Sequence, residues 1–338
     1  MTEPLLRRLH LRGERLTVGA LPWVAPIYRA MPQVSAVIEL PFAHGGLQWK
    51  ARRTLARELR GRFDAAYVCP NSLKSALLPW WAGVGKRIGY HGEMRYGVLN
   101  QRLTNPAKGS RPPMVAFYSA LSGDADVQND RPQLRLQPEI VDAQLKEMGL
   151  QRGTYVVFAP GAEYGPAKRW PVSHFVELAL QLPVQVVLLG SGKEAALCRS
   201  IASELEHANA VQCIDLSGRT SLDQALAVIS AAQSMVSNDS GLMHVAAALS
   251  VPQVAVFGSS SPLHTPPLSD KAHVLWLKND PNYQPALDCA PCFARECPLG
   301  HTRCLQDVAP ADVARLLAIQ TNSKTGAPSK AVLVKKVL

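Results

Sequence analysis

The stretch Asn238-Asp-Ser-Gly-Leu-Met-His244 decides the fold of the C-terminal half of this chain. It follows the apolar run 234–237 and precedes a helix-like run, so the pattern predicts a strand, a tight turn and a helix. Asp239 or Ser240 is placed to cap that helix, whose first backbone N–H groups form a ready anion site. His244 lies about one turn inside, where its ring can face a bound anion. Taken alone, these seven residues could equally form a capped turn with a core histidine.

Three more apolar runs in this half end in a small or polar turn. They are 155–159 before Pro160–Glu163, 184–189 before Gly190–Gly192, and 253–257 before Gly258–Pro262. Continuous apolar runs that alternate with helical stretches predict a buried parallel sheet with crossover helices. Ligands of such sheets bind beyond the carboxyl ends of the strands, so the four turns are expected to converge on one site.

Length and composition predict a globular protein of enzyme size. The 338 residues leave room for two domains with separate cores, and 47% of them are hydrophobic. No apolar stretch approaches the ~18 residues of a transmembrane helix. The N-terminus lacks the apolar core and cleavage site of a signal peptide, which predicts a cytosolic protein.

The net charge of +10 is unevenly distributed along the chain. Residues 1–120 contain 18 Lys and Arg against 6 Asp and Glu, whereas residues 121–338 contain 18 against 20. A positive field at one end suits an anionic partner, such as a phosphorylated lipid or a membrane surface. Nucleic acid is the weaker candidate because no binding motif or aromatic stacking series accompanies the charge. The alternative is that these basic residues form a solvated surface and bind no partner.

The chain is expected to divide into two domains and a tail. In the first half, apolar segments lie at 16–21, 36–40 and 65–69, and helix-like segments lie at 47–59, 73–82 and 115–121. The polar segment Ser122–Pro138 is interpreted as an exposed linker. The predicted divisions are a domain at 1–135, a domain at 136–320 and a mobile tail at 321–338.

Seven cysteines fall into two groups. Cys69, Cys198 and Cys213 are isolated in apolar or helical surroundings, which predicts buried structural thiols. The others, Cys289, Cys292, Cys297 and Cys304, follow one another closely with His301 among them. Their spacing could hold a structural zinc, although it is not a standard paired-knuckle pattern. Reduced thiols packing an irregular loop are the favoured interpretation, and disulfides are not expected in the cytosol.

Several long motifs together resemble one known family. They are Pro160-Gly-Ala-Glu-Tyr-Gly-Pro-Ala-Lys-Arg-Trp-Pro171, the 238–244 turn, Gly258-Ser-Ser-Ser-Pro262, Cys292-Phe-Ala-Arg-Glu-Cys-Pro-Leu-Gly-His301, Pro70-Asn-Ser-Leu-Lys-Ser75 and Gly92-Glu-Met-Arg-Tyr-Gly97. The chain resembles the ADP-heptose:lipopolysaccharide heptosyltransferases of glycosyltransferase family 9, and most closely the type II group. The resemblance covers nearly the whole chain.

This resemblance implies an α/β fold of GT-B type, in which two Rossmann-like domains face each other across a cleft. The C-terminal domain would bind ADP-L-glycero-D-manno-heptose, and the N-terminal domain would bind the anionic heptosyl-Kdo2-lipid A acceptor. Heptose would be transferred with inversion during synthesis of the lipopolysaccharide inner core. The enzyme would be cytoplasmic and peripherally associated with the inner-membrane surface, and would need no cofactor.

The resemblance also assigns residues to the two ligands. Lys168 matches the lysine that contacts the donor diphosphate, where a cation neutralises charge on the leaving ADP. The alternative interpretation is that Lys168 is an ordinary exposed lysine that precedes Trp170. The remaining expected donor contacts are Gly161, Glu163, Ser191, Glu194, Thr220, Asp239, Ser240, Gly241 and His244, with Thr220 beside the adenine and Glu194 on the ribose. The expected acceptor contacts are Asn71, Lys74, Glu93 and Arg95.

No metal is expected in the reaction, because lysine and helix N-termini can supply the positive charge. The pair Asp124 and Asp126 lies in the polar linker rather than at a strand end, and is not interpreted as a metal site.

The chain departs from the family pattern at its start. Family members open with a strand and a Gly-Asp turn, and that aspartate is the proposed general base. Met1 aligns just after it, so both the strand and the base are expected to be missing, leaving a gap in the first sheet. The carboxylates before residue 60 are Glu3, Glu14, Glu39 and Glu58, and none follows such a turn. A start codon placed too late, or a truncated and inactive chain, would explain this.

Two alternatives of other classes are left open by the sequence. One is a non-catalytic protein that binds a nucleotide sugar, which donor binding without transfer would identify. The other is a nucleotide-dependent dehydrogenase, because Gly190-Ser-Gly192 follows a strand and Asp215 lies at a plausible distance beyond it. Absence of NAD binding would dismiss the second alternative.

Overall fold

The computed structural model describes residues 1–43, 46–107, 111–124, 130–209 and 212–322. The chain divides into two compact units, Met1–Pro132 and Gln133–Leu338. This division lies next to the expected boundary between residues 135 and 136. The tail was predicted to begin at residue 321, but helix α12 (Pro310–Asn322) includes its first two positions. Residues 323–338 lie outside the described residues.

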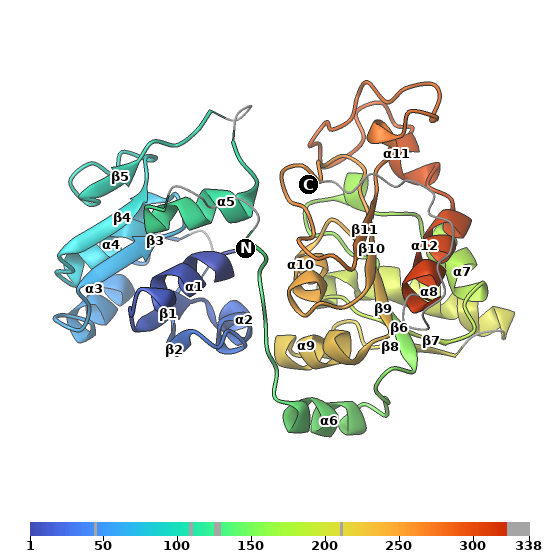
Figure 1. Ribbon diagram of the computed structural model, residues 1–338, viewed down its shortest axis with the longest axis horizontal. Helices are drawn as coiled ribbons and strands as arrows, with labels where there is room; N and C mark the ends of the chain where they lie inside the picture. The colour runs from blue at the N-terminus through green and yellow to red at the C-terminus, as the bar shows by residue number, and fades with distance from the viewer. Residues whose placement is uncertain (44–45, 108–110, 125–129, 210–211, 323–338) are drawn as a thin grey trace. The chain divides into compact units, whose positions relative to one another are not determined.

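The second unit is built on six parallel strands (Figure 1). They are β6 (Tyr155–Ala159), β7 (Gln185–Leu188), β8 (Cys213–Asp215), β9 (Ser234–Asn238), β10 (Gln253–Val256) and β11 (Ala272–Leu275), in the order β11-β10-β9-β6-β7-β8. The principal helices are α6 (Pro138–Glu147), α7 (Val172–Leu180), α8 (Ala195–Ala208), α9 (Leu222–Ala231), α10 (Gly241–Ala248), α11 (Arg303–Gln306) and α12. All four strands predicted from apolar runs in this half are therefore confirmed.

The core of the second unit explains why these strands lack polar alternation. Every residue of β6, β9 and β10 is buried, because helices cover both faces of the sheet. Trp170, Phe158 and Phe175 form the aromatic centre of the main core cluster. The loop that follows β6 is thus anchored by a tryptophan inside the hydrophobic core.

The first unit contains two parallel sheets, β1–β2 and β3–β4–β5. Its strands are β1 (Leu16–Ala20), β2 (Val34–Glu39), β3 (Ala65–Val68), β4 (Lys86–Tyr90) and β5 (Gln101–Leu103). Its helices are α1 (Glu3–Leu11), α2 (Ala25–Arg29), α3 (Trp49–Glu58), α4 (Leu73–Trp81) and α5 (Met114–Ser119). The sequence predicted β1, β2 and β3, but it missed β4 and β5, whose residues form no apolar run. Among the described strands, none joins the two sheets.

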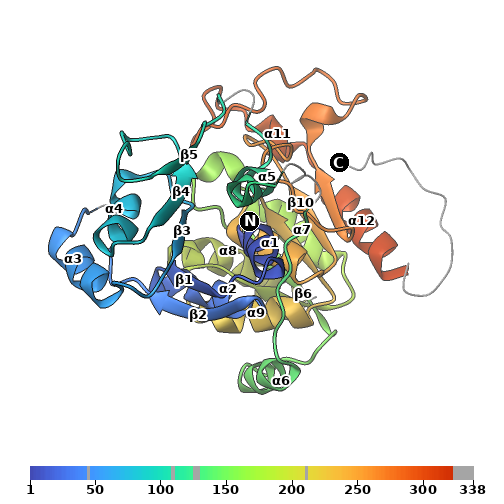
Figure 2. The same ribbon diagram turned by 60° about the vertical axis from the view of Figure 1, so that its left-hand side comes forward.

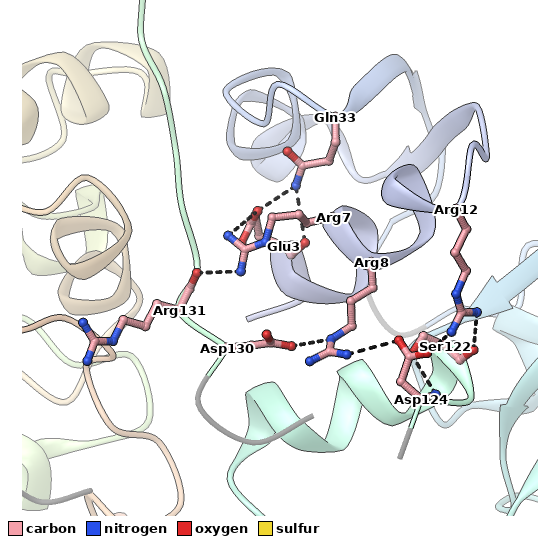
Figure 3. A network of polar contacts seen from close by, with 9 residues as sticks. All are labelled: Glu3, Arg7, Arg8, Arg12, Gln33, Ser122, Asp124, Asp130 and Arg131. Carbon is pink, nitrogen blue, oxygen red and sulfur yellow. Dashed lines mark hydrogen bonds and ion pairs between the residues drawn. The ribbon is translucent and has the colours of Figure 1, made fainter. Parts of the chain in front are cut away.

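Helix α1 is fixed to the end of the first unit by a network of arginines and aspartates (Figure 3). Arg8 Nε lies 2.5 Å from Asp130 Oδ2, and Arg8 Nη1 lies 3.1 Å from Asp124 Oδ2. Arg12 pairs with Asp124 as well and donates to the Ser122 carbonyl at 2.7 Å. The hydrogen bond from the Ser122 hydroxyl, together with Arg8 and Arg12, lowers the pKa of Asp124.

This network corrects the expectation that Ser122–Pro138 is simply an exposed linker. Asp124 and Asp130 are counter-ions for α1, so the segment is anchored to the first unit near its start and again at Asp130. Asp124 is thereby engaged by two arginines, while Asp126 lies outside the described residues. Among the helices that the structure describes, none combines the length and apolarity needed to cross a bilayer.

Candidate functional site

Two charged side chains meet where the strand order of the second sheet reverses. Strand β6 has β7 on one side and β9 on the other, and a reversal of this kind is where ligands bind in open α/β sheets. Lys168 ends the short helix η4 (Pro166–Lys168) after β6, and Asp239 follows β9. Lys168 Nζ lies 2.5 Å from Asp239 Oδ2, and both side chains are largely buried.

Asn238 holds the loop that carries Lys168. Its Oδ1 accepts the backbone N–H of Trp170 at 2.9 Å, and its Nδ2 donates to the Pro160 carbonyl at 2.7 Å. Asn238 is fully buried, so both of these bonds are made away from water. The two ends of the 160–170 loop are therefore fixed against the end of β9, and the lysine between them is positioned by the sheet.

Helix α10 begins directly beside this ion pair. Ser240 occupies its N-cap position with an extended backbone, as predicted, but the Ser240 hydroxyl makes no capping hydrogen bond. Asp239 is instead paired with Lys168 and accepts a long bond from Thr265 Oγ1 at 3.4 Å. Side-chain capping of α10 was thus wrongly expected. The helix N-terminus and Lys168 together supply the positive potential that an anion requires.

His244 lies in the first turns of α10. Burial of its ring lowers the pKa of His244 to about 4, while Asp239 raises that pKa and Lys168 lowers it. The imidazole is therefore neutral at pH 7 and offers one N–H donor and one acceptor nitrogen. It can hydrogen-bond a ligand, but it adds no positive charge to the site.

The loops after β6 and β7 meet at Glu194. Its Oε2 accepts from the backbone N–H of Ser191 at 2.7 Å and from the Ser191 hydroxyl at 2.9 Å. A Cβ at Gly161 would lie 1.8 Å from Glu194 Oε1, so this glycine lets the two loops approach. The structure therefore brings Gly161, Ser191 and Glu194 together. Glu194, whose carboxylate was predicted to bind a ribose, already accepts two hydrogen bonds from Ser191 within its own turn.

Two more expected contacts lie at this edge of the sheet. Thr220 is half-buried in the loop after β8, where the Gly218 N–H donates to the Gly190 carbonyl at 2.9 Å and joins that loop to the β7 loop. Glu163 is exposed, and its Oε1 lies 3.7 Å from Lys193 Nζ. The predicted contact of Thr220 with the adenine stays a prediction, and Glu163 is exposed to solvent.

The cysteine-rich segment is attached to the loop that carries Lys168. The Ala167 N–H donates to the Arg295 carbonyl at 3.1 Å, and Arg295 Nε donates to the Tyr164 carbonyl at 2.8 Å. The centroid of the Tyr164 ring lies 5.6 Å from Lys168 Nζ and 5.6 Å from the Arg295 guanidinium carbon. This segment therefore helps to hold the loop that carries Lys168.

The four clustered cysteines and His301 surround a cavity of about 10 Å³. His301 Nδ1 accepts the Arg303 N–H at 3.1 Å, which leaves the ring proton on Nε2, 3.9 Å from Cys289 Sγ. Burial raises the pKa of Cys304 to about 11; at Cys297, hydrogen bonds from backbone N–H groups outweigh burial and lower the pKa. Among the described residues, no group of three or more potential ligands is arranged to hold a metal ion.

The comparisons with known proteins agree on one family. The profile of glycosyltransferase family 9 (heptosyltransferase) matches residues 52–302. Lipopolysaccharide heptosyltransferase 2 of Escherichia coli is 44% identical over 294 residues, which cover 82% of this chain and 84% of that protein. Lipooligosaccharide heptosyltransferase 2 of Haemophilus influenzae is 37% identical over the same shares of the two chains.

This chain belongs to glycosyltransferase family 9. The solved structure of E. coli ADP-heptose LPS heptosyltransferase II superposes with a TM-score of 0.81 at 37% identity and covers 96% of this chain and 95% of that one. The fold of this family 9 protein is accordingly the GT-B fold, with two Rossmann-like α/β units. The fold class expected from the sequence is confirmed.

In this family 9 protein, the four expected acceptor residues also lie together, in the first unit. Arg95 is buried, donates to the Pro70 carbonyl at 2.7 Å and to Asn71 Oδ1 at 3.2 Å, and also bonds the Tyr90 carbonyl. Glu93 Oε2 accepts the N–H of Leu73 at 2.7 Å, at the start of α4, and Lys74 is the next residue. Arg95 and Glu93 thus shape this corner, while their predicted contact with an acceptor stays a prediction.

Some residues of the family 9 site were not singled out from the sequence. Asn238 was quoted only as part of a motif, although a buried asparagine at a strand end is a usable signal. Thr265 reaches the site from a loop with no recognisable pattern, whereas Arg295 was quoted only as part of the Cys292–His301 motif. The hydroxyls of Ser237, Ser259 and Ser260 are buried and have no hydrogen-bond partner among the described residues. Buried hydroxyls normally have partners, so these three are exceptions among the described residues.

Three of the four early carboxylates of this family 9 protein have structural partners. Glu3 is buried, accepts from Gln33 Nε2 at 2.8 Å and lies 3.6 Å from Arg7. Glu14 accepts the Tyr67 hydroxyl at 3.1 Å, and Glu39 pairs with Arg29. Glu58 is exposed on α3. None of these contacts joins an early carboxylate to a residue expected to bind the acceptor.

Proposed function

We propose that this protein transfers L-glycero-D-manno-heptose from ADP-heptose to heptosyl-Kdo2-lipid A in synthesis of the lipopolysaccharide inner core, with inversion at the anomeric carbon. The curated relatives are named lipopolysaccharide or lipooligosaccharide heptosyltransferases, and the matching solved structure is named an ADP-heptose LPS heptosyltransferase. The protein is accordingly a glycosyltransferase that acts on this donor and an anionic lipid-linked acceptor.

The observation that carries this proposal is the position of Lys168 at the switch point of the second sheet. Negative charge develops on the ADP leaving group as the glycosidic bond breaks. A cation and a helix N-terminus fixed beside that group stabilise the charge in the transition state without reorganisation. Lys168 supplies the cation, on the loop that Asn238 holds at both ends by hydrogen bonds. The first turn of α10 supplies the helix N-terminus. Neutral His244 adds a hydrogen bond to a phosphate or sugar oxygen.

The acceptor is proposed to bind the first unit, near Asn71 and Lys74. This unit carries the excess of positive charge, and a lipid A-core acceptor carries several negative charges. We place the working enzyme on the cytoplasmic surface of the inner membrane, where such an acceptor is embedded. Attraction of a basic protein to anionic lipids supports this placement.

The two alternatives from the sequence gain no support. A dinucleotide would need the free N–H groups of the Gly190–Gly192 turn, but the Ser191 N–H is bonded to Glu194 at 2.7 Å. A dehydrogenase is therefore disfavoured by the geometry as well as by the family. No relative reported above is named as a binding protein without transfer activity.

The test is transfer of heptose to a mono-heptosylated acceptor in detergent, followed by mass spectrometry. Lys168→Ala is expected to lower the rate by about 10²–10³-fold, as for loss of one charge-stabilising group. Lys193→Ala is the matched control, because Lys193 is exposed and makes only a 3.7 Å pair at the rim. Equal rates for Lys168→Ala and the control would contradict the proposal.

A further inference from the structure

Helix α3 has two chemically distinct faces. Residues Arg52, Leu55, Ala56 and Leu59, at a spacing of three and four, are buried against the rest of the unit. Trp49, Arg53 and Arg57 follow one another at intervals of four, so they share the opposite, solvent-facing side with Lys50. An amphipathic helix whose exposed face contains cations and a tryptophan differs from an ordinary solvated helix.

A second exposed tryptophan lies on the neighbouring helix. Trp49 of α3 and Trp80 of α4 are 47% and 45% exposed, and Trp81 lies between them. The ring centroids of Trp49 and Trp81 are 4.4 Å apart, and those of Trp80 and Trp81 are 6.4 Å apart. Figures 1 and 2 both show α3 beside α4. The two helices thus present one aromatic cluster to solvent.

The cations of this surface have no counter-ion among the residues that the structure describes. Lys50, Arg53 and Arg57 are exposed and make no ion pair or side-chain hydrogen bond with the described residues. The arginines of α1, by contrast, are paired with Asp124 and Asp130. The positive charge of the first unit is therefore neutralised around α1 and left open along α3.

Buried Arg52 keeps this surface in one geometry. Its Nε donates to the Leu47 carbonyl at 2.7 Å, ahead of α3, and its Nη1 donates to the Lys74 carbonyl at 3.2 Å, in α4. Its guanidinium also lies 4.0 Å from the centroid of the Phe42 ring. One side chain thus joins the two helices, so the tryptophans and the cations are presented together.

We propose that this Trp–Arg face, defined as Trp49, Lys50, Arg53, Arg57 and Trp80, docks the protein on a lipid bilayer that contains anionic headgroups. Indole rings prefer the boundary between headgroups and acyl chains, and long cationic side chains reach phosphates while their stems stay in apolar surroundings. The proposal rests on the proposed function only in taking a membrane as the working surface; it does not depend on the transfer chemistry.

The exposed tryptophans favour a bilayer, rather than a soluble polyanion, as the partner of this surface. Electrostatic binding to a soluble anion would use the cations and leave the indoles in water, whereas an interface buries both. The surface is also well placed for a lipid-linked acceptor. Trp80 lies seven residues along α4 from Leu73, or about 10 Å, and Leu73 touches Glu93 in the expected acceptor corner.

The test measures partition of the full chain onto vesicles of phosphatidylglycerol and phosphatidylethanolamine by sedimentation, with no donor or acceptor present. Changing Trp49 and Trp80 to Ala is expected to weaken partition by roughly tenfold, from the apolar area kept in water. Changing Lys50, Arg53 and Arg57 to Gln is expected to weaken it on the order of a hundredfold at low salt. Phosphatidylglycerol brominated on its acyl chains should quench tryptophan fluorescence of the unchanged protein, and much less that of the Trp49 and Trp80 variant.

Trp23→Ala is the matched aromatic control, since Trp23 is 66% exposed elsewhere in the same unit. Changing the exposed Arg15, Arg135 and Arg199 to Gln controls for net charge. Circular dichroism and ADP titration check that each variant is folded. Partition that falls equally in the controls, or not at all in the Trp–Arg variants, would overturn the proposal. If the protein fails to bind vesicles but still transfers heptose in detergent, the docking proposal is overturned and the proposed function stands. If transfer is lost while vesicle binding is intact, the proposed function is overturned and the docking proposal stands.

Discussion

Asn238 and Trp170 are joined by a hydrogen bond between residues 68 positions apart, from the Trp170 backbone N–H to Asn238 Oδ1 at 2.9 Å. The other end of the same amide donates to the Pro160 carbonyl at 2.7 Å. One side chain at the end of β9 therefore fixes both ends of the loop that carries Lys168. The position of the Lys168 ammonium group depends on these two hydrogen bonds of Asn238. Substitution of Asn238 tests them separately from the charge of Lys168.

Asn238→Asp is expected to lower the free energy of unfolding by about 2–3 kcal/mol and to weaken ADP binding by roughly tenfold. The carboxylate keeps the shape but cannot donate to Pro160, and it places a charge in a buried site. Urea unfolding and titration calorimetry with ADP measure the two effects. Gln233→Ala is the control, because its amide donates to Gly153 at 2.7 Å just before β9 begins. Unchanged ADP affinity in Asn238→Asp would show that these two hydrogen bonds do not position the site.

Substitution of the two ion-pair partners is expected to affect ADP binding differently. Lys168→Ala removes a charge-assisted contact worth about 1.5–3 kcal/mol, which weakens ADP binding by roughly 10- to 100-fold. Asp239→Asn removes the carboxylate that competes with a phosphate for Lys168, so ADP is expected to bind as tightly or up to about tenfold more tightly. Titration calorimetry compares both variants with the unchanged protein. Equal weakening in the two would mean that Asp239 itself contacts the nucleotide.

His244 is expected to make stability depend on pH in a defined window. Because burial lowers its pKa in the folded protein to about 4, the unfolded chain binds this proton more tightly. The contribution of the neutral ring is complete above about pH 6.5 and is lost as the pH falls toward 4, on the order of 2–3 kcal/mol in all. Urea unfolding between pH 4 and pH 7 measures this slope.

His244→Gln is expected to flatten most of the slope. Burial also lowers the pKa of His273, so a smaller dependence of the same sign should remain. His10→Gln, at an exposed position of α1, is the matched control for the substitution. A slope as steep in His244→Gln as in the unchanged protein would assign the effect to other groups.

Gly165→Ala is expected to lower the free energy of unfolding by about 1–3 kcal/mol, because a Cβ there would lie 2.3 Å from the Arg295 carbonyl oxygen. The clash is with backbone, so the cysteine-rich segment would have to move away from the Lys168 loop. Gly192→Ala, with nothing within 4 Å of its added Cβ, is the matched control. Thermal unfolding of both variants tests whether this contact is tight. Equal melting temperatures would mean that the segment yields freely.

Much of the second unit could be predicted because its strands are buried on both faces. Burial requires continuous apolar runs, and those runs located β6, β7, β9 and β10 and the polar turns after them. The first unit was harder, because β4 contains Lys86, Arg87 and Gly89, and the short β5 contains Gln101 and Arg102. Their identity as strands depends on pairing with β3, a non-local contact that a short sequence window does not reveal.

The sequence by itself determined the family, the alternation of strands and helices in the second unit, and the charge excess of residues 1–120, since these depend on residue types and local periodicity. The tertiary structure decided which polar side chains are free to act. It paired Lys168 with Asp239, engaged Glu194 with Ser191, buried Arg95 against three backbone and side-chain oxygens, and left Lys50, Arg53 and Arg57 open on α3. The physical reason is that hydrogen bonds and ion pairs join residues tens of positions apart, and only the folded chain fixes their distances and their access to water.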